Sequence, residues 1–139
     1  MRPLLLLSAF TLVSLGAAAA VWSAAPAPQV AALAQVEPGQ WQVKPFLGEG
    51  PARSLCISNA ASFIQIEHGE ASCSRFVVED RPGVATVSYS CPGAGSGRTT
   101  IRVETTRLLD IQSQGIVNNA PFEVRYEARR TGPCGAAAR

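Results

Sequence analysis

Histidine and lysine are almost missing from this sequence of 139 residues, in which His68 is the one histidine and Lys44 the one lysine. The usual zinc patterns are therefore excluded, and a histidine-dependent catalytic triad would have to use His68. Charged residues make up only 16% of the chain, and the net charge is +2. This balance, with arginines scattered along the chain, indicates no nucleic acid and no anionic membrane as a partner.

Short catalytic and cofactor motifs are missing as well. The GxSxG, HExxH, P-loop, Rossmann and Cys-x-x-Cys patterns do not occur in the sequence. His68 lies between Glu67 and Glu70, which is an ordinary surface arrangement for a histidine. Glu79 and Asp80 come directly before a turn, where we expect solvated charges. We therefore expect no catalytic residue, no cofactor and no metal site.

The first residues differ in composition from the rest of the chain. Arg2 is the only charged residue before Glu37, and the apolar run from Leu4 to Val21 ends in small residues. This pattern is typical of a secretory signal peptide, which we expect over residues 1–23, cleaved at its end. Cleavage after Ala34 and retention of the leader as a membrane anchor are the alternatives. After cleavage, we expect the protein to be in the periplasm or outside the cell, without a stable membrane anchor.

Two further segments follow the predicted leader. Residues 24–36 carry no charge and contain two prolines, which predicts a linker or a flexible new N-terminus. Residues 37–139 have the size of one domain. Its core would be modest at this size, so covalent crosslinks would add appreciably to its stability.

Alternating apolar and polar residues predict that this domain consists mainly of β-strands. Residues 122–129 alternate most clearly, with four apolar side chains on one face and four charged side chains on the other. The same alternation occurs over 41–44, 101–104 and 109–114, and we expect Trp41 to be a core anchor. Residues 118–121 predict a turn.

One short helix is predicted over residues 60–66. Ser58 or Asn59 is a suitable cap, and Gly69 is a suitable end. A helix of about two turns must be stabilised by packing on the sheet. The predicted fold class is mainly β: a curved antiparallel sheet or partly closed barrel of roughly five to seven strands with one short helix and two disulfides.

The four cysteines of this small exported chain imply two disulfides, for which three pairings are possible. Cys73 begins and Cys91 ends a predicted hairpin whose turn signal is Arg81–Gly83. If the hairpin folds about the proline of that turn, the two cysteines lie opposite each other at nearly the separation a disulfide needs. A two-residue Pro-Gly turn would change this register by one residue. We prefer the bridge Cys73–Cys91, which leaves Cys56 with Cys134.

Several short segments together carry a family resemblance. They are Glu37–Val43, the Leu55–Ile57 step, the pair Cys73 and Cys91, and Thr131–Cys134. They look like the DUF3617 family of small exported bacterial proteins, over about residues 37 to 134. The resemblance implies a periplasmic or secreted protein, and it transfers no catalytic or ligand-binding residue.

These observations predict a non-catalytic binding or interaction module. Its partner would be an envelope protein or an apolar small molecule, contacted by the concave side of the sheet or by loops around 93–97 and 118–121. The alternatives are an enzyme without a recognisable short motif and an inhibitor of an envelope enzyme. The interior of the sheet distinguishes them, because an apolar cavity favours a small-ligand carrier, a filled interior favours partner binding, and a polar cleft with convergent Arg and Glu favours an enzyme.

Overall fold

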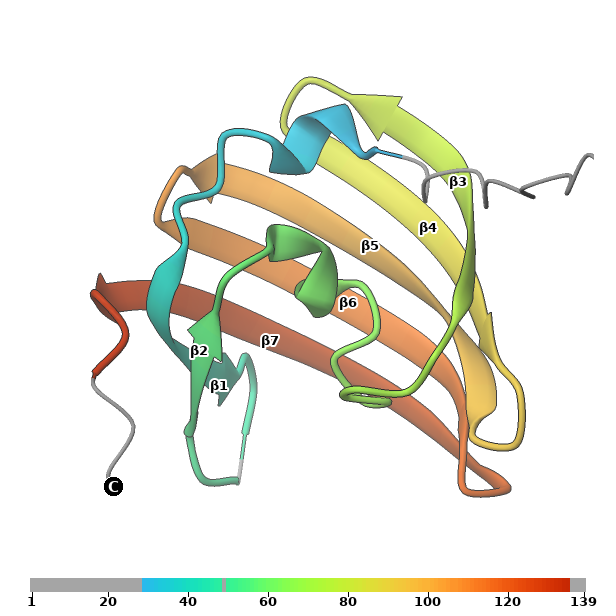
Figure 1. Ribbon diagram of the computed structural model, residues 1–139. Coiled ribbons are helices and arrows are strands. Elements are labelled where there is room, and N and C mark those ends of the chain that lie inside the picture. Colours follow the sequence, from blue (N-terminus) through green and yellow to red (C-terminus); the bar gives the residue numbers. More distant parts are fainter. Residues whose placement is uncertain (1–28, 49, 136–139) are drawn as a thin grey trace, which may run out of the picture.

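The computed structural model describes residues 29–48 and 50–135, in which seven antiparallel strands form one sheet in the order β2-β1-β7-β6-β5-β4-β3. The strands are β1 (Gly39–Pro45), β2 (Arg53–Ile57), β3 (Ser74–Arg81), β4 (Val84–Cys91), β5 (Gly95–Thr105), β6 (Leu108–Val117) and β7 (Ala120–Gly132). The sheet curves strongly without closing, so β2 and β3 remain its edges (Figure 1). The predicted mainly-β class is confirmed. The predicted leader, residues 1–23, lies outside the described residues.

Strands β3 to β7 follow one another as a meander joined by tight turns, and the strand alternation predicted in β5, β6 and β7 is confirmed. The turn between β6 and β7 consists of Asn118 and Asn119, whose φ angles are 50° and 64°. Two successive left-handed residues match the twist of a hairpin, and asparagine tolerates this conformation better than other side chains. The turn predicted from residues 118–121 is therefore confirmed at 118 and 119, whereas 120 and 121 already belong to β7.

The β3–β4 hairpin reaches the predicted register by an unpredicted route. Pro82 and Gly83 form the two-residue turn that would have shifted the pairing by one residue. A bulge between Val77 and Glu79 removes this shift, so that Val77 still lies opposite Val87. One extra residue in a strand offsets one residue in the turn. The predicted pairing near the cysteines therefore holds, although the predicted turn about the proline alone is wrong.

The N-terminal hairpin pairs with the last strand of the chain. β1 lies between β2 and β7, which places residues 40–45 beside 126–132. Trp41 is fully buried on the inner side of β1, so the prediction of a core anchor is confirmed. Its ring packs edge-on against Phe63 with 5.2 Å between ring centroids.

The predicted helix over 60–66 is a shorter 3-10 turn, η2 (Ala60–Phe63). Asn59 caps it, because its Oδ1 accepts the N–H of Ala61 at 2.9 Å. Phe63, Ile64 and Ile66 are all buried. Gln65 between them is buried as well, and four successive buried residues do not form the one-sided apolar stripe of a surface helix, so the chain continues past Phe63 in irregular turns. Figure 1 shows η2 inside the curve of the sheet.

Part of the predicted linker belongs to the folded domain. A second 3-10 turn, η1 (Ala31–Leu33), lies against the sheet, and Leu33 and Val36 are buried in the core. The carboxylate of Asp80 accepts the N–H groups of Ala31 at 2.7 Å and of Ala32 at 2.9 Å. Asp80 is exposed, as predicted for a charge beside a turn, but its carboxylate also holds η1, and packed structure begins ahead of Glu37. We call the open side of the sheet between β2 and β3, which η1 and η2 cover, the seam.

Candidate functional site

Apolar side chains fill the concave interior of the sheet. The largest fully buried ones come from β1, β4, β5, β6 and η2; they are Trp41, Phe63, Ile64, Ile101, Leu109, Ile111, Val43 and Val87. Depressions of about 270 to 510 Å³ in the described part of the chain open to solvent and do not enclose a cavity. Of the three interiors considered above, the structure therefore has the filled one.

His68 lies inside the protein, which makes the prediction of a surface histidine wrong. It is only 9% exposed, and its ring contacts the edges of the Tyr89 and Phe122 rings. Nε2 lies 3.0 Å from the carbonyl oxygen of Ile116, which can only accept, so Nε2 carries a hydrogen. Nδ1 lies 3.1 Å from the Tyr89 hydroxyl. Both ring nitrogens therefore have partners within the fold.

Further buried polar groups satisfy one another in the same region. The Thr99 hydroxyl donates to the carbonyl oxygen of Ile64 at 2.5 Å and lies 2.7 Å from the Ser113 hydroxyl. Burial raises the pKa of Tyr89, whose ring occupies the space above Gly97. A side chain at position 97 would collide with that ring, because its Cβ would lie 2.4 Å from the tyrosine oxygen. This network fixes the interior.

The cysteines form the two disulfides that the sequence favours. Cys56 is bonded to Cys134 and Cys73 to Cys91, and no cysteine of the described residues is free. The first bridge joins β2 to the end of β7, and the second joins the start of β3 to the end of β4. Two structural disulfides indicate an oxidising environment outside the cytoplasm.

The two loops predicted to contact a partner lie side by side. The N–H of Asn118 donates to the carbonyl oxygen of Ala94 at 3.3 Å, and the two turns line one depression of about 500 Å³. Only the first part of the glycine-rich segment 93–97 is a loop, because β5 already begins at Gly95. A Cβ at this position would lie 2.0 Å from the Ile116 carbonyl oxygen, so only glycine allows the two strands to approach here.

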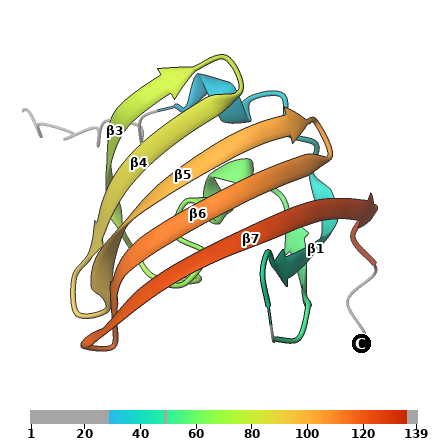
Figure 2. The same ribbon diagram turned by 180° about the vertical axis from the view of Figure 1, so that it is seen from behind.

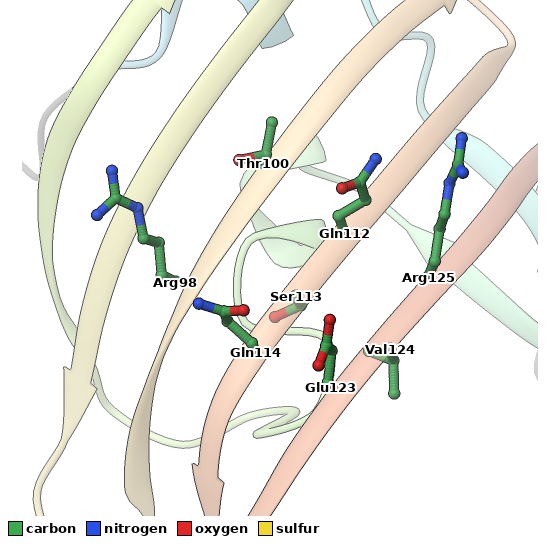
Figure 3. Close-up of a pocket in the computed structure, with 8 residues that line it drawn as sticks. All are labelled: Arg98, Thr100, Gln112, Ser113, Gln114, Glu123, Val124 and Arg125. Carbon is green, nitrogen blue, oxygen red and sulfur yellow. The ribbon is translucent and has the colours of Figure 1, made fainter.

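A second depression, of about 510 Å³, lies on the outer face of the sheet. Figure 2 shows this face with β5, β6 and β7 side by side. The residues that line the depression come from these strands and are mostly polar: Arg98, Thr100, Gln112, Ser113, Gln114, Glu123, Val124 and Arg125. Figure 3 shows their side chains, with Arg98 on one side of the group and Glu123 and Arg125 on the other. Strand pairing brings Arg98 opposite Gln114, and Gln114 opposite Glu123.

Arg125 is held rigidly at one side of this depression. Its Nε lies 3.1 Å and its Nη2 2.6 Å from Oδ2 of Asp110, and the guanidinium carbon lies 3.8 Å from the centre of the Phe46 ring. The hydrogen bonds to Asp110 raise the pKa of Arg125. A bidentate ion pair and a stacked ring both restrict a guanidinium to one orientation. This side of the depression therefore presents a fixed cation.

The hydroxyl groups that line the depression are engaged elsewhere. Thr100 Oγ1 lies 3.0 Å from Thr86 Oγ1, and Ser113 is bonded to Thr99 in the interior. No hydroxyl here is paired with a base, which a nucleophile requires. The arrangement offers amide, carboxylate and guanidinium groups for hydrogen bonding. It is suited to recognition of a polar surface.

Sequence reasoning found the charged face of residues 122–129 but missed the site. The strand alternation placed Glu123 and Arg125 outside, whereas their neighbours on β5 and β6 depend on the pairing of strands. A register for the two hairpins β5–β6 and β6–β7 would have aligned Arg98, Gln114 and Glu123 in one row. The tight Asn-Asn turn is the signal from which half of that register follows.

Residues 29–48 and 50–135 contain no group of three or more His, Cys, Asp or Glu side chains that could hold a metal ion. No helix within these residues is both long enough and apolar enough to cross a membrane. No family model, curated protein or solved structure matches the chain. The resemblance to the DUF3617 family therefore remains a prediction.

Proposed function

We propose that the chain is a non-catalytic module of the bacterial envelope that binds a partner protein through the outer face of β5, β6 and β7. The observation that carries the proposal is the filled interior, which leaves no space for an apolar ligand within the sheet. Recognition must then use an outer surface. Among these surfaces, the outer-face depression combines volume, hydrogen-bonding groups and an arginine in a fixed orientation.

The charges of the depression suit a protein partner. Arg125 is already ordered by Asp110, so little side-chain entropy is lost when a partner binds it. Arginine is also enriched at protein interfaces, where it contributes strongly to affinity. Glu123 and Arg98 lie in one row across three strands and would fix the orientation of a partner with complementary charges.

The placement in the periplasm or outside the cell is part of this proposal. The disulfides favour an oxidising compartment, and the leader pattern of residues 1–23 favours export. Cleavage after residue 23 is favoured over cleavage after Ala34, because the later cut would remove Leu33 from the core. Intact-mass measurement of the mature protein tests this: the chain should begin at Ala24, and a chain that begins at Gln35 contradicts it.

The partner surface is tested by photo-crosslinking in cells. A benzoylphenylalanine at Gln112, in the centre of the depression, should give one discrete adduct. The control is the same replacement at Gln40, an amide on β1 outside the depression. We expect Arg98→Glu to abolish the Gln112 adduct and Arg102→Glu, with the same change of charge outside the depression, to preserve it. Equal adducts at both positions, or an adduct that survives Arg98→Glu, contradict the proposal.

A further inference from the structure

Arg75 lies at the seam, between two clefts. It is on β3 opposite Tyr89, and it lines both a cleft of about 340 Å³ beside η1 and η2 and a cleft of about 290 Å³ beside the turn that follows η2. Both clefts open to solvent, unlike the packed interior. The residue is partly buried, so its guanidinium group has lost part of its hydration.

The cation of Arg75 has no anionic partner among the residues that the structure describes. Its Nη2 donates to Oε1 of Gln65 at 2.7 Å, and its Nε is buried without any hydrogen-bond partner. The carboxylate of Asp80, which is also on β3, is already used by the backbone of η1. Glu70 lines the second cleft but forms no ion pair with Arg75. A partly buried guanidinium whose one acceptor is a neutral amide is unfavourable, and an anion bound in a cleft beside it would neutralise its charge.

Gln65 holds this guanidinium in place without neutralising it. Gln65 is only 5% exposed, and its Nε2 donates to the carbonyl oxygens of Gly69 at 2.9 Å and Ala71 at 2.8 Å. These two bonds fix the amide so that Oε1 faces Arg75. The fold therefore positions a cation at the clefts and supplies only a neutral partner for it.

The first cleft adds an apolar wall to this cation. Small or apolar side chains of the η1 and η2 segments form much of its lining, among them Val30, Leu33, Ala34, Val36, Ala60 and Ala61. A guanidinium presents parallel N–H groups that match the two oxygens of a carboxylate. A ligand with one carboxylate and a short apolar body would pair with Arg75 and cover this wall.

We propose that this cleft at the seam binds a small amphiphilic carboxylate. The carboxylate accepts N–H groups of Arg75, and the apolar body lies against η1 and η2. The site is separate from the outer-face depression, because the two share no lining residue. Loss of binding at either site would therefore leave the other proposal standing.

Nuclear magnetic resonance on the oxidised protein tests the site with sodium octanoate as the probe. We expect saturable shifts of the Arg75 Nε–H signal and of the backbone amides of η1 and η2. Acetate lacks the apolar body and octan-1-ol lacks the charge, so each should bind at least about tenfold more weakly. Octyl phosphate carries the other anion that arginine recognises. Tighter binding of octyl phosphate than of octanoate, or equal binding of octanol, overturns the carboxylate assignment.

Three variants locate the binding. Arg75→Gln should weaken octanoate binding by about tenfold or more, and Arg98→Gln, which removes an arginine from the outer face, should change it by less than about twofold. Ala61→Leu fills the apolar part of the cleft, leaves Arg75 intact and should reduce the affinity for octanoate towards that for acetate. If Arg75→Gln does not fold, Ala61→Leu alone tests the proposed binding of octanoate. Unchanged octanoate affinity in folded Arg75→Gln or in Ala61→Leu overturns the proposal.

Discussion

Strands β4 to β7 and the seam are two regions of one domain, and different interactions hold each of them in place. β4 and β5 pair without interruption over eight residues each, from Val84 opposite Arg102 to Cys91 opposite Gly95. At the seam, two short turns are fixed by side chains that bind backbone groups, such as Asp80 and Gln65, and by disulfides at both edges. The guanidinium of Arg75, which has no ion-pair partner among the described residues, lies in this second region. Repetitive pairing builds the frame, and individual side-chain contacts build its open side.

Removal of the disulfides one at a time should have the largest effect on the free energy of unfolding. The Cys56–Cys134 bridge spans 78 residues and the Cys73–Cys91 bridge 18 residues. On the chain-entropy model, the double variant C56A/C134A should lower the free energy of unfolding by about 4 to 5 kcal/mol, and C73A/C91A by about 3 kcal/mol. Chemical denaturation of the two variants beside the wild type measures both values.

Hydrogen exchange of the same variants shows where the stability is lost. We expect the amides of β2 to exchange faster in C56A/C134A, and those of β3 in C73A/C91A. The amides of β5 and β6 should open only with global unfolding in both variants, because they lie in the middle of the sheet. Faster exchange in β6 than in β2 would contradict the distinction between frame and seam.

A smaller effect is expected for Asp80→Ala at the seam. The Asp80 carboxylate satisfies two backbone N–H groups of η1, and loss of such a cap costs about 1 to 2 kcal/mol. The matched control is Glu79→Ala, because Glu79 pairs only with Arg81 on the surface, where an ion pair contributes about 0 to 1 kcal/mol. Denaturation midpoints compare the two variants. Equal losses would show that the Asp80 contacts do not hold η1.

The frame could be predicted from the sequence because its signals are local. Alternation marks β7 through residues 122–129, and the Asn118-Asn119 turn fixes its pairing with β6. The cysteine pairing followed from the same kind of hairpin argument, and a bulge at Val78 preserved the result when the turn differed. Local periodicity and turn chemistry act over a few residues, which is the range that a sequence pattern reports.

The seam and the buried position of His68 could not be predicted because their contacts join residues far apart in the sequence. Asp80 binds Ala31 across 49 positions, and His68 binds Ile116 across 48. Nothing near His68 in the sequence distinguishes a surface histidine from one enclosed by Tyr89 and Phe122. The outer-face depression also needs three strands in register, so only its β7 residues were visible as one charged face. Tertiary packing decides such positions.

The smallest expected effect is a difference between the two tyrosines at alkaline pH. Burial raises the pKa of Tyr89 on β4, whereas the pKa of Tyr126 is raised by burial and also by its hydrogen bond to Glu67 at 2.9 Å. The pKa of a tyrosine in the unfolded chain is about 10, so the unfolded chain releases these protons at a lower pH than the folded protein does. The contribution of the two tyrosines to stability should therefore be fully present below about pH 10, and it should be lost as the pH rises through their raised pKa values in the folded protein. Absorbance titration at high pH is readily interpreted, since these are the only tyrosines and Lys44 is the only lysine. Glu67→Gln should lower the pKa of Tyr126 more than that of Tyr89, because Tyr126 loses a hydrogen bond whereas Tyr89 loses only the influence of the charge. Equal movement of both pKa values would show that the hydrogen bond does not set the difference.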